Sequence, residues 1–220
     1  MKSHKLKVQK TAHYYTLGEA TPNTKYFWIV CHGYGQLAAS FIQSFRSIAS
    51  PDNFILAPEG LSHFYWKNFR DLAVASWMTS QNRVDEIEDY TNYLKSLYDQ
   101  YRQDLPQDVK IILMGFSQGC ATQCRWIMKE LPDFEYLMLW GGLLPEDLQY
   151  KQQQAYFASK KILSVYGRQD PLLTLERQQW QKNFALAQGL QVENHIFNGK
   201  HEIDRSFLKE MDQFIRVAET

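Results

Sequence analysis

Short apolar segments rich in β-branched and aromatic residues alternate with longer amphipathic segments from one end of the chain to the other. We expect strands over Tyr26–His32, Phe54–Ala57, Val109–Met114, Tyr136–Trp140, Lys161–Tyr166 and Val192–Phe197. Segments between them, such as Arg83–Arg102, repeat apolar residues at the spacing of one helix face. Alternating strands and helices are typical of a parallel sheet covered by helices on both faces. The predicted fold class is therefore α/β.

Two of the expected strands are apolar at nearly every position and lack the alternation of a half-exposed strand. They are YFWIVC at residues 26–31 and VKIILM at residues 109–114. Such runs are expected where helices cover both faces of a sheet. Helical patterns also follow Ser117 and occupy Leu175–Ala187 and Ser206–Val217. The N-terminal stretch LKVQKTAHYYTL predicts an additional edge strand or a hairpin.

The chain has 220 residues, 45% of them hydrophobic, which is enough for one sizeable core. No internal repeat, low-complexity segment or linker divides it. We therefore expect residues 1–220 to form a single α/β domain.

The charge balance and cysteine content limit the partners and the compartment. Lys plus Arg and Asp plus Glu each number 24, so no net field attracts nucleic acid, and a small or neutral partner is expected. No uncharged apolar run has the length of a membrane span or a signal peptide. An odd, sparse set of three cysteines indicates no disulfide framework, and we expect a cytoplasmic protein. Cys120 and Cys124 are expected to be buried packing residues. A homo-oligomer is possible, because scattered aromatic residues on a surface are normal and do not decide the oligomeric state.

The segment GFSQG, residues 115–119, follows an apolar strand and precedes a helical pattern. A serine between glycines in this context is typical of a nucleophile elbow, a tight turn that exposes the hydroxyl over a helix N-terminus. The alternative is an ordinary turn that happens to contain a serine. The sequence therefore makes Ser117 the candidate nucleophile.

A serine nucleophile needs a histidine base and an acid that orients it, and in this fold class the acid precedes the histidine in the chain. Only His195 and His201 follow Ser117. His195 lies inside an expected strand, whereas His201 follows the strand end, where sites of open α/β sheets gather. Asp170 in the turn GRQDP is the favoured acid. The reserve candidates are Asp147 and Glu146, and Asp133 falls at the wrong edge of the sheet.

An oxyanion needs backbone N–H donors, each worth roughly 10² to 10³ in rate. The elbow supplies one at Gln118. The second is expected from the glycine-rich loop CHGYGQ, residues 31–36, which directly follows the first long apolar strand. The alternative for this loop is an ordinary turn.

With these motifs, the chain resembles an α/β-hydrolase of the phospholipase/carboxylesterase family, which includes acyl-protein thioesterases. The motifs that carry the resemblance are HGYG at 32–35, APEG at 57–60, GFSQG at 115–119, WGGLLP at 140–145, GRQDPLL at 167–173 and GKHEI at 199–203. The resemblance implies Ser117 as nucleophile, Asp170 and His201 as its partners, and the N–H groups of Tyr34 and Gln118 as the oxyanion hole. The chain departs from the family's usual residues at Gln36, Cys120, Met78–Thr79 and Lys200.

The segment Gly60–Trp77 is a long connection dense in aromatic residues. It is either a loop packed on its own side chains or a wall of an acyl pocket. Candidate substrate-binding residues are Phe64, Tyr65, Trp66 and Trp77.

Together these observations predict a serine hydrolase that cleaves carboxylic esters or thioesters of small molecules and requires no metal or organic cofactor. The alternatives are an acetyl or feruloyl esterase acting on carbohydrate-linked esters, a peptidase, and a binding protein that keeps the fold without turnover. The ordered set of Ser117, Asp170 and His201 favours the hydrolase.

Overall fold

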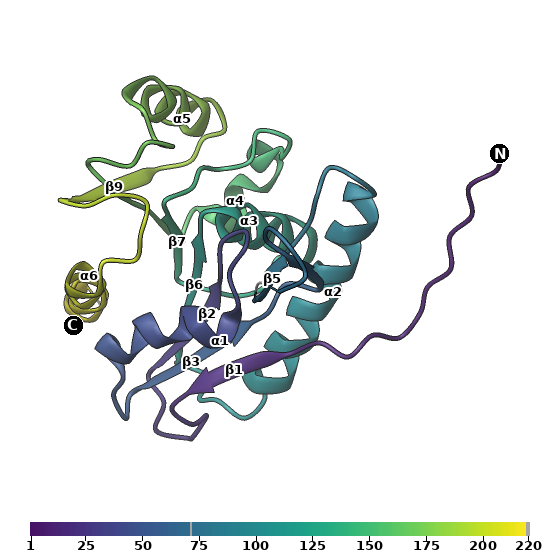
Figure 1. Cartoon of the computed structure of the whole chain (residues 1–220). Helices are drawn as coiled ribbons and strands as arrows, with labels where there is room; N and C mark the ends of the chain where they lie inside the picture. Colours follow the sequence, from purple (N-terminus) through teal and green to yellow (C-terminus); the bar gives the residue numbers. More distant parts are fainter. Residues whose placement is uncertain (71, 219–220) are drawn as a thin grey trace.

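The chain is described from a computed structural model that covers residues 1–70 and 72–218. Within those residues the strands form a mixed central sheet in the order β1-β3-β2-β6-β7-β8-β9 and a separate hairpin, β4-β5 (Figure 1). The strands span Tyr14–Leu17 (β1), Tyr26–Cys31 (β2), Asn53–Pro58 (β3), Ser62–Tyr65 (β4), Ala73–Ser76 (β5), Lys110–Phe116 (β6), Tyr136–Trp140 (β7), Lys161–Gly167 (β8) and Val192–Phe197 (β9). The helical segments span Ala38–Phe41 (α1), Ile42–Ile48 (η1), Arg83–Arg102 (α2), Gln118–Glu130 (α3), Tyr150–Gln153 (η2), Gln154–Phe157 (α4), Leu175–Ala187 (α5) and Arg205–Ala218 (α6).

The sheet is parallel throughout except at one edge, where β1 pairs antiparallel with β3. The predicted α/β class is confirmed, and the expected strands form with ends shifted by one or two residues. Of the two interpretations of the N-terminal stretch, the structure has the edge strand. Its pairing runs from Tyr14 opposite Pro58 to Leu17 opposite Ile55.

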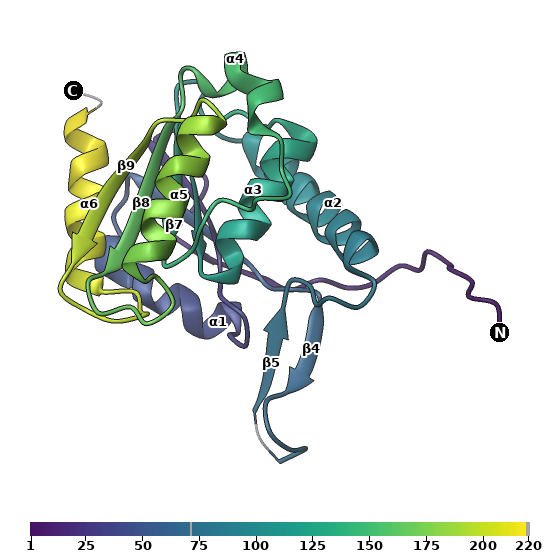
Figure 2. The same ribbon diagram turned by 90° about the horizontal axis from the view of Figure 1, so that it is seen from above.

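Both faces of the sheet are covered, which explains the apolar runs. Along β2, Phe27 and Ile29 pack on one side with residues of α2 and α3. Trp28 and Val30 pack on the other side with residues of α1, η1 and α6. Figure 2 shows α6 and α1 on one side of the sheet and α2 and α3 on the other. Because successive side chains of a strand point to opposite faces, a strand buried on both faces has no polar positions.

The connection after β3 forms a β-hairpin that projects from the rest of the chain (Figure 2). β4 and β5 pair antiparallel, from Ser62 opposite Ser76 to Tyr65 opposite Ala73. The sequence analysis did not predict strands in this connection; they form because the two short segments satisfy each other's backbone hydrogen bonds. At the base of the hairpin, the Gly35 N–H donates to the Ala75 carbonyl at 2.9 Å.

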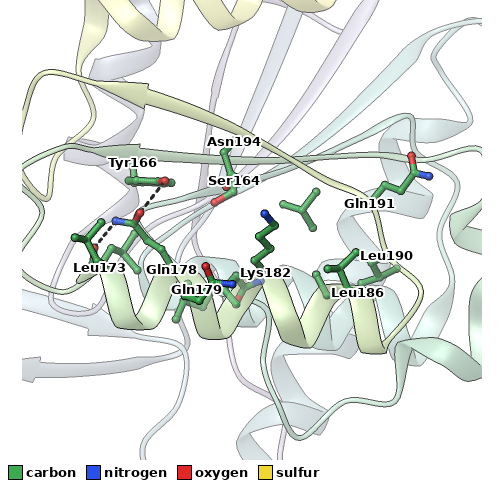
Figure 3. Close-up of a pocket in the computed structure, with 15 residues that line it drawn as sticks. Ser164, Tyr166, Leu173, Gln178, Gln179, Lys182, Leu186, Leu190, Gln191 and Asn194 are labelled. Carbon is green, nitrogen blue, oxygen red and sulfur yellow. Dashed lines mark hydrogen bonds between the residues drawn. The ribbon is translucent and has the colours of Figure 1, made fainter.

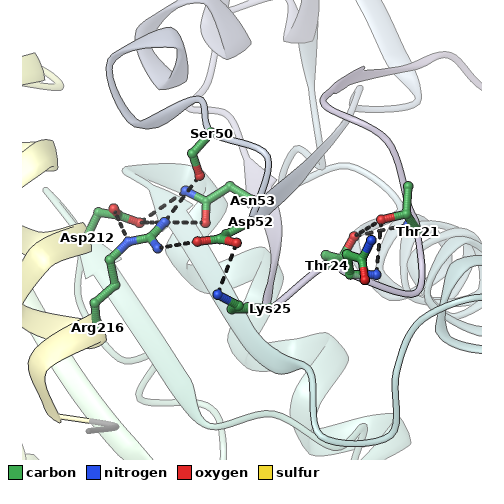
Figure 4. Close-up of polar contacts among 9 residues, drawn as sticks. Thr21, Thr24, Lys25, Ser50, Asp52, Asn53, Asp212 and Arg216 are labelled. Carbon is green, nitrogen blue, oxygen red and sulfur yellow. Dashed lines mark hydrogen bonds and ion pairs between the residues drawn. The ribbon is translucent and has the colours of Figure 1, made fainter.

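The C-terminal helix is fixed to the start of β3 by a polar cluster at its last turn (Figure 4). The Arg216 Nε donates to the Asp212 carboxylate at 2.7 Å, and an Nη donates to the Asn53 side chain at 2.7 Å. The Asn53 amide in turn donates to Asp212 at 3.1 Å. The guanidinium also lies over the Tyr26 ring, 4.5 Å from its centroid. These contacts join α6 to β3 and β2.

Helix α2 has 20 residues and carries charged side chains on its exposed face. In the part of the chain that the structure describes, no helix combines the length and apolar character needed to cross a membrane. Cys120 and Cys124 are completely buried, and both belong to the core beneath α3, as expected for packing residues.

Candidate active site

Ser117 forms the turn between the end of β6 and the start of α3, and its backbone is strained. Its φ is 53° and its ψ is −114°, a conformation that is costly for a residue with a side chain. The Ser117 N–H donates to the Trp140 carbonyl at 2.9 Å, which holds the turn against the next strand. Such strain persists only where the surroundings enforce it, so the turn marks a candidate functional site.

The two glycines that flank Ser117 are required by close packing. A Cβ on Gly115 would lie 2.3 Å from the Gly119 carbonyl oxygen. A Cβ on Gly119 would lie 2.1 Å from the Cys31 carbonyl oxygen. The helix after the serine can therefore start against β2 and β6 only when neither flanking residue has a side chain.

His201 and Asp170 are brought together across 31 positions of sequence. The His201 Nδ1 lies 2.7 Å from the Asp170 Oδ2. The Asp170 side chain is 1% exposed, and its other oxygen accepts the Leu172 N–H at 2.8 Å. Because the carboxylate accepts, Nδ1 of His201 carries the proton in this pair and Nε2 remains available as a base.

The His201 ring rests against residues next to the serine turn. Its centroid lies 4.9 Å from that of the Phe116 ring. A Cβ on Gly141 would lie 3.1 Å from the His201 Cε1, and Gly141 has a positive φ of 62°, so glycine is needed there for two reasons. Ser117, Asp170 and His201 follow the C-terminal ends of β6, β8 and β9, and all three therefore lie at one edge of the sheet.

The reserve acids are engaged elsewhere. Asp147 accepts from Arg125 at 3.0 Å and from Arg83 at 2.5 Å. Glu146 is exposed. The pairing of His201 thus separates Asp170 from the reserve candidates, a distinction that spacing in the sequence left open.

His195 and Asp133, the other two residues considered in the sequence, also lie outside the cluster of Asp170 and His201. His195 sits within β9, packed edge-on against Phe214 at 4.9 Å, with its Nε2 2.9 Å from Glu193. Asp133 pairs with Lys160 at 2.7 Å at the far end of α3. Both side chains have structural partners of their own.

His32 organises the glycine-rich loop, a role that sequence analysis did not assign. Its Nδ1–H donates to the Gly33 carbonyl at 2.8 Å, and its Nε2 accepts the Gly60 N–H at 2.9 Å. Burial lowers the pKa of His32, while the hydrogen bond to Gly33 acts in the opposite direction. The neutral ring therefore joins the loop after β2 to the loop after β3.

Gln118 clamps the elbow to the end of the hairpin. Its Oε1 accepts the Trp77 N–H at 3.1 Å, and its Nε2 donates to the Met78 carbonyl at 2.8 Å. Its own backbone N–H lies in the first turn of α3, where no intrahelical acceptor exists. The Tyr34 N–H likewise has no acceptor among the described residues.

Two other polar side chains support the glycine-rich loop and were also missed. The Gln36 Oε1 accepts the Gly33 N–H at 2.8 Å, which closes the loop on itself. The buried Glu59 accepts the Ala38 N–H at 2.9 Å and contacts the His63 Nε2 at 2.9 Å. Their signal in the sequence is a polar residue at the end of an apolar strand, which does not reveal its partner.

The aromatic candidates divide into two groups. Phe64 and Trp66 pack against the Tyr34 ring, with centroids 5.2 and 5.6 Å away. Tyr65 points to the other side of β4 and packs on Phe69. Trp77 is buried, and its indole N–H donates to the His32 carbonyl at 2.8 Å. Of the four candidates, the half-buried Phe64 and the exposed Trp66 therefore flank the glycine-rich loop.

Within residues 1–70 and 72–218, no three His, Cys, Asp or Glu side chains gather in an arrangement that could hold a metal ion. The groups present at this edge of the sheet are a hydroxyl, an imidazole bonded to a carboxylate, and backbone N–H donors. This set is suited to nucleophilic attack on a carbonyl.

A comparison with family models finds one match, described as phospholipase/carboxylesterase, over residues 19–219. The chain belongs to the phospholipase/carboxylesterase family. Membership of this family supports a hydrolase of the esterase or thioesterase type, and the resemblance inferred from the motifs is confirmed. A comparison with curated proteins finds no match.

Solved structures share the fold of this family member. The esterase PE8 is 20% identical, with a TM-score of 0.70 over 94% of this chain and 99% of that one. Acyl-protein thioesterase 2 from Zea mays is 15% identical, with a TM-score of 0.73 over the same shares. A phospholipase/carboxylesterase from Dyadobacter fermentans is 16% identical, with a TM-score of 0.63 over 94% and 97%. At these identities the likeness establishes the α/β-hydrolase fold.

Proposed function

We propose that this protein is a serine hydrolase that cleaves carboxylic esters or thioesters through an acyl-enzyme. The observation that carries the proposal is the 2.7 Å contact between His201 Nδ1 and Asp170, at the sheet edge that also holds the strained Ser117. A histidine oriented by a buried carboxylate beside a strained serine is the arrangement that activates a hydroxyl. Membership of the phospholipase/carboxylesterase family supports the same chemistry.

The reaction follows from the roles of these groups. The Ser117 Oγ attacks the carbonyl carbon while the His201 Nε2 takes the hydroxyl proton. The Tyr34 and Gln118 N–H groups donate to the oxygen as negative charge develops on it. His201 then gives the proton to the leaving alcohol or thiol, and the acyl group stays on Ser117. In the second half, His201 takes a proton from water as the water oxygen attacks the acyl carbonyl. His201 then returns the proton to the Ser117 Oγ as the bond from the acyl carbon to Oγ breaks, which releases the acid and restores the serine.

The substrate is a small acyl ester or thioester whose apolar part packs on the hairpin. Phe64 and Trp66 offer aromatic surface directly beside Tyr34, whose N–H belongs to the proposed oxyanion hole. Binding pockets are typically lined by such aromatic side chains with a few convergent polar groups. We therefore expect activity to depend on the length of the acyl chain.

The test is kcat/KM on p-nitrophenyl esters from acetyl to decanoyl. Ser117→Ala is expected to lower kcat at least about a thousandfold at every chain length, because the nucleophile is lost. Asp170→Asn is expected to lower kcat roughly 10³- to 10⁴-fold, because the imidazole loses the acceptor that orients it.

The matched control is Asp147→Asn, which removes the reserve carboxylate and is expected to leave kcat close to that of the parent. Hydrolysis that persists in Ser117→Ala contradicts the proposed nucleophile. Equal losses in Asp147→Asn and Asp170→Asn contradict the proposed acid.

A further inference from the structure

A cavity of about 470 Å³ lies between α5 and the strands β8 and β9 (Figure 3). None of Ser117, His201 and Tyr34 lines it. The cavity therefore differs from the candidate active site.

Polar side chains interrupt the face of α5 that lines this cavity, beside Leu175, Ala185 and Leu186 of the same helix. Gln178, Gln181 and Lys182 line it, at the spacing of a single helix face. A helix that packs directly on a sheet normally presents apolar residues there. Figure 3 shows Lys182 reaching from α5 toward the strands. Because polar side chains replace the usual apolar strip, the helix leaves room beneath it.

The strands oppose this face with polar residues of their own. Ser164 of β8 and Asn194 of β9 are paired in register and both line the cavity. Neighbouring positions in register on parallel strands project to the same face of a sheet. Polar side chains thus meet across the cavity from the helix and from the sheet.

Gln181 supplies an unused donor. The residue is 6% exposed, and its Oε1 accepts the Leu144 N–H at 3.1 Å. Its buried Nε2 has no hydrogen-bond partner among the described residues. A buried donor without an acceptor is unfavourable, so this amide would gain a hydrogen bond if the side chain turned toward an acceptor of a ligand in the cavity.

The charge of the lining favours an anion. Among the described residues that line the cavity, Lys182 is the only Lys or Arg, and no Asp or Glu is present. Lys182 forms no ion pair within the described chain. The lining also contains aliphatic side chains, among them Leu173, Leu186 and Leu190. A ligand with one anionic end and an aliphatic body matches both parts of this lining.

We propose that this cavity binds a small organic monocarboxylate. The carboxylate accepts from the exposed Lys182 ammonium and, once the amide turns toward the cavity, from the Gln181 Nε2–H, and the alkyl chain packs on the leucines. This site goes beyond the proposed hydrolysis, although a carboxylic acid is also the product class of that reaction. Binding here requires neither Ser117 nor His201, so it is tested without measuring hydrolysis.

The test is a titration of the ¹⁵N-labelled full chain with sodium octanoate, followed by amide chemical shifts. We expect the side-chain amides of Gln181 and Asn194 and the backbone amides of α5 to shift with one saturating curve. Octanol, which has the same chain without the charge, is expected to bind at least about tenfold more weakly.

Lys182→Met keeps an aliphatic stem and removes the charge, and we expect it to weaken octanoate binding about tenfold. Lys209→Met, on the exposed side of α6, is the matched control and should leave binding unchanged. The proposal is overturned by shifts confined to residues around Ser117, by no shifts at about 10 mM octanoate, by equal binding of octanol, or by an unaffected Lys182→Met. A failure of ester hydrolysis would leave all of these results unchanged, so the two proposals fail separately.

Discussion

His32 is buried at the end of β2, and its two ring nitrogens have opposite roles. The Nδ1–H donates to Gly33, whereas Nε2 accepts from Gly60. A protonated ring carries a hydrogen on both nitrogens, so Nε2 would face the Gly60 N–H with a second donor. Protonation therefore breaks the link between the loops after β2 and β3.

This link predicts a pH dependence of stability. Burial lowers the pKa of His32 in the folded chain, so the unfolded chain binds the proton more tightly. Its contribution to stability is complete above the unfolded pKa of about 6.5. It is lost as pH falls from there toward the folded pKa. We expect urea unfolding of wild type and His32→Gln to differ more at about pH 7.5 than at about pH 5. Parallel pH profiles of the two proteins would contradict this account.

At the scale of elements, the hairpin and the glycine-rich loop form one unit through Gly35 and Trp66. A Cβ on Gly35 would lie 2.0 Å from the Trp66 ring, and Gly35 has a φ of 74°. Gly35→Ala is therefore expected to cost about 1–2 kcal/mol for the backbone conformation and about 1–3 kcal/mol for overpacking. Because the displaced segment includes Tyr34, kcat/KM on p-nitrophenyl esters should fall as well.

A double-mutant cycle separates the two terms. In a Trp66→Ala background, Gly35→Ala should cost only the backbone term, because the ring is gone. The free energy of unfolding in urea measures both steps. Additive effects of the two substitutions would show that Trp66 does not press on the loop.

The elements also show which parts of the fold can be predicted from the sequence and which cannot. The inner strands β2, β3, β6, β7 and β8 are predictable because each is a mostly apolar run that is buried on both faces. β4 and β5 cannot be predicted in this way, because each strand has four residues and mainly pairs with the other. The turn at Ser117 is marked locally by Gly115 and Gly119. No local residue marks the partner of His201, because the contact with Asp170 depends on how the ends of β8 and β9 meet.

The cavity beneath α5 lies beyond sequence analysis for a similar reason. Gln178, Gln181 and Lys182 occur at helical spacing, but a polar helix face is normally exposed to solvent. Only the placement of α5 beside Ser164 and Asn194 makes these side chains line a cavity.

For the whole molecule, Arg216 joins α6 to the strands β3 and β2. Arg216→Met keeps the stem but removes the guanidinium that donates to the Asp212 carboxylate and to the Asn53 side-chain oxygen, so that, among the described residues, Asp212 keeps only the Asn53 amide as a donor. We expect the free energy of unfolding to fall by about 2 kcal/mol and Tm to fall by about 4–8 °C. Arg205→Met, in the exposed first turn of the same helix, should change the free energy of unfolding by less than about 0.5 kcal/mol. Equal effects of the two substitutions in thermal unfolding would contradict a role for the cluster.

The burial of the cysteines has a practical consequence for chemical labelling. Burial raises the pKa of all three thiols, that of Cys124 to about 12, so the reactive thiolate form is suppressed in the folded chain. Phe69 in the hairpin is 90% exposed. A cysteine placed at position 69 would therefore react well before the native ones, and a dye or spin label can be attached there while Cys31, Cys120 and Cys124 stay in place.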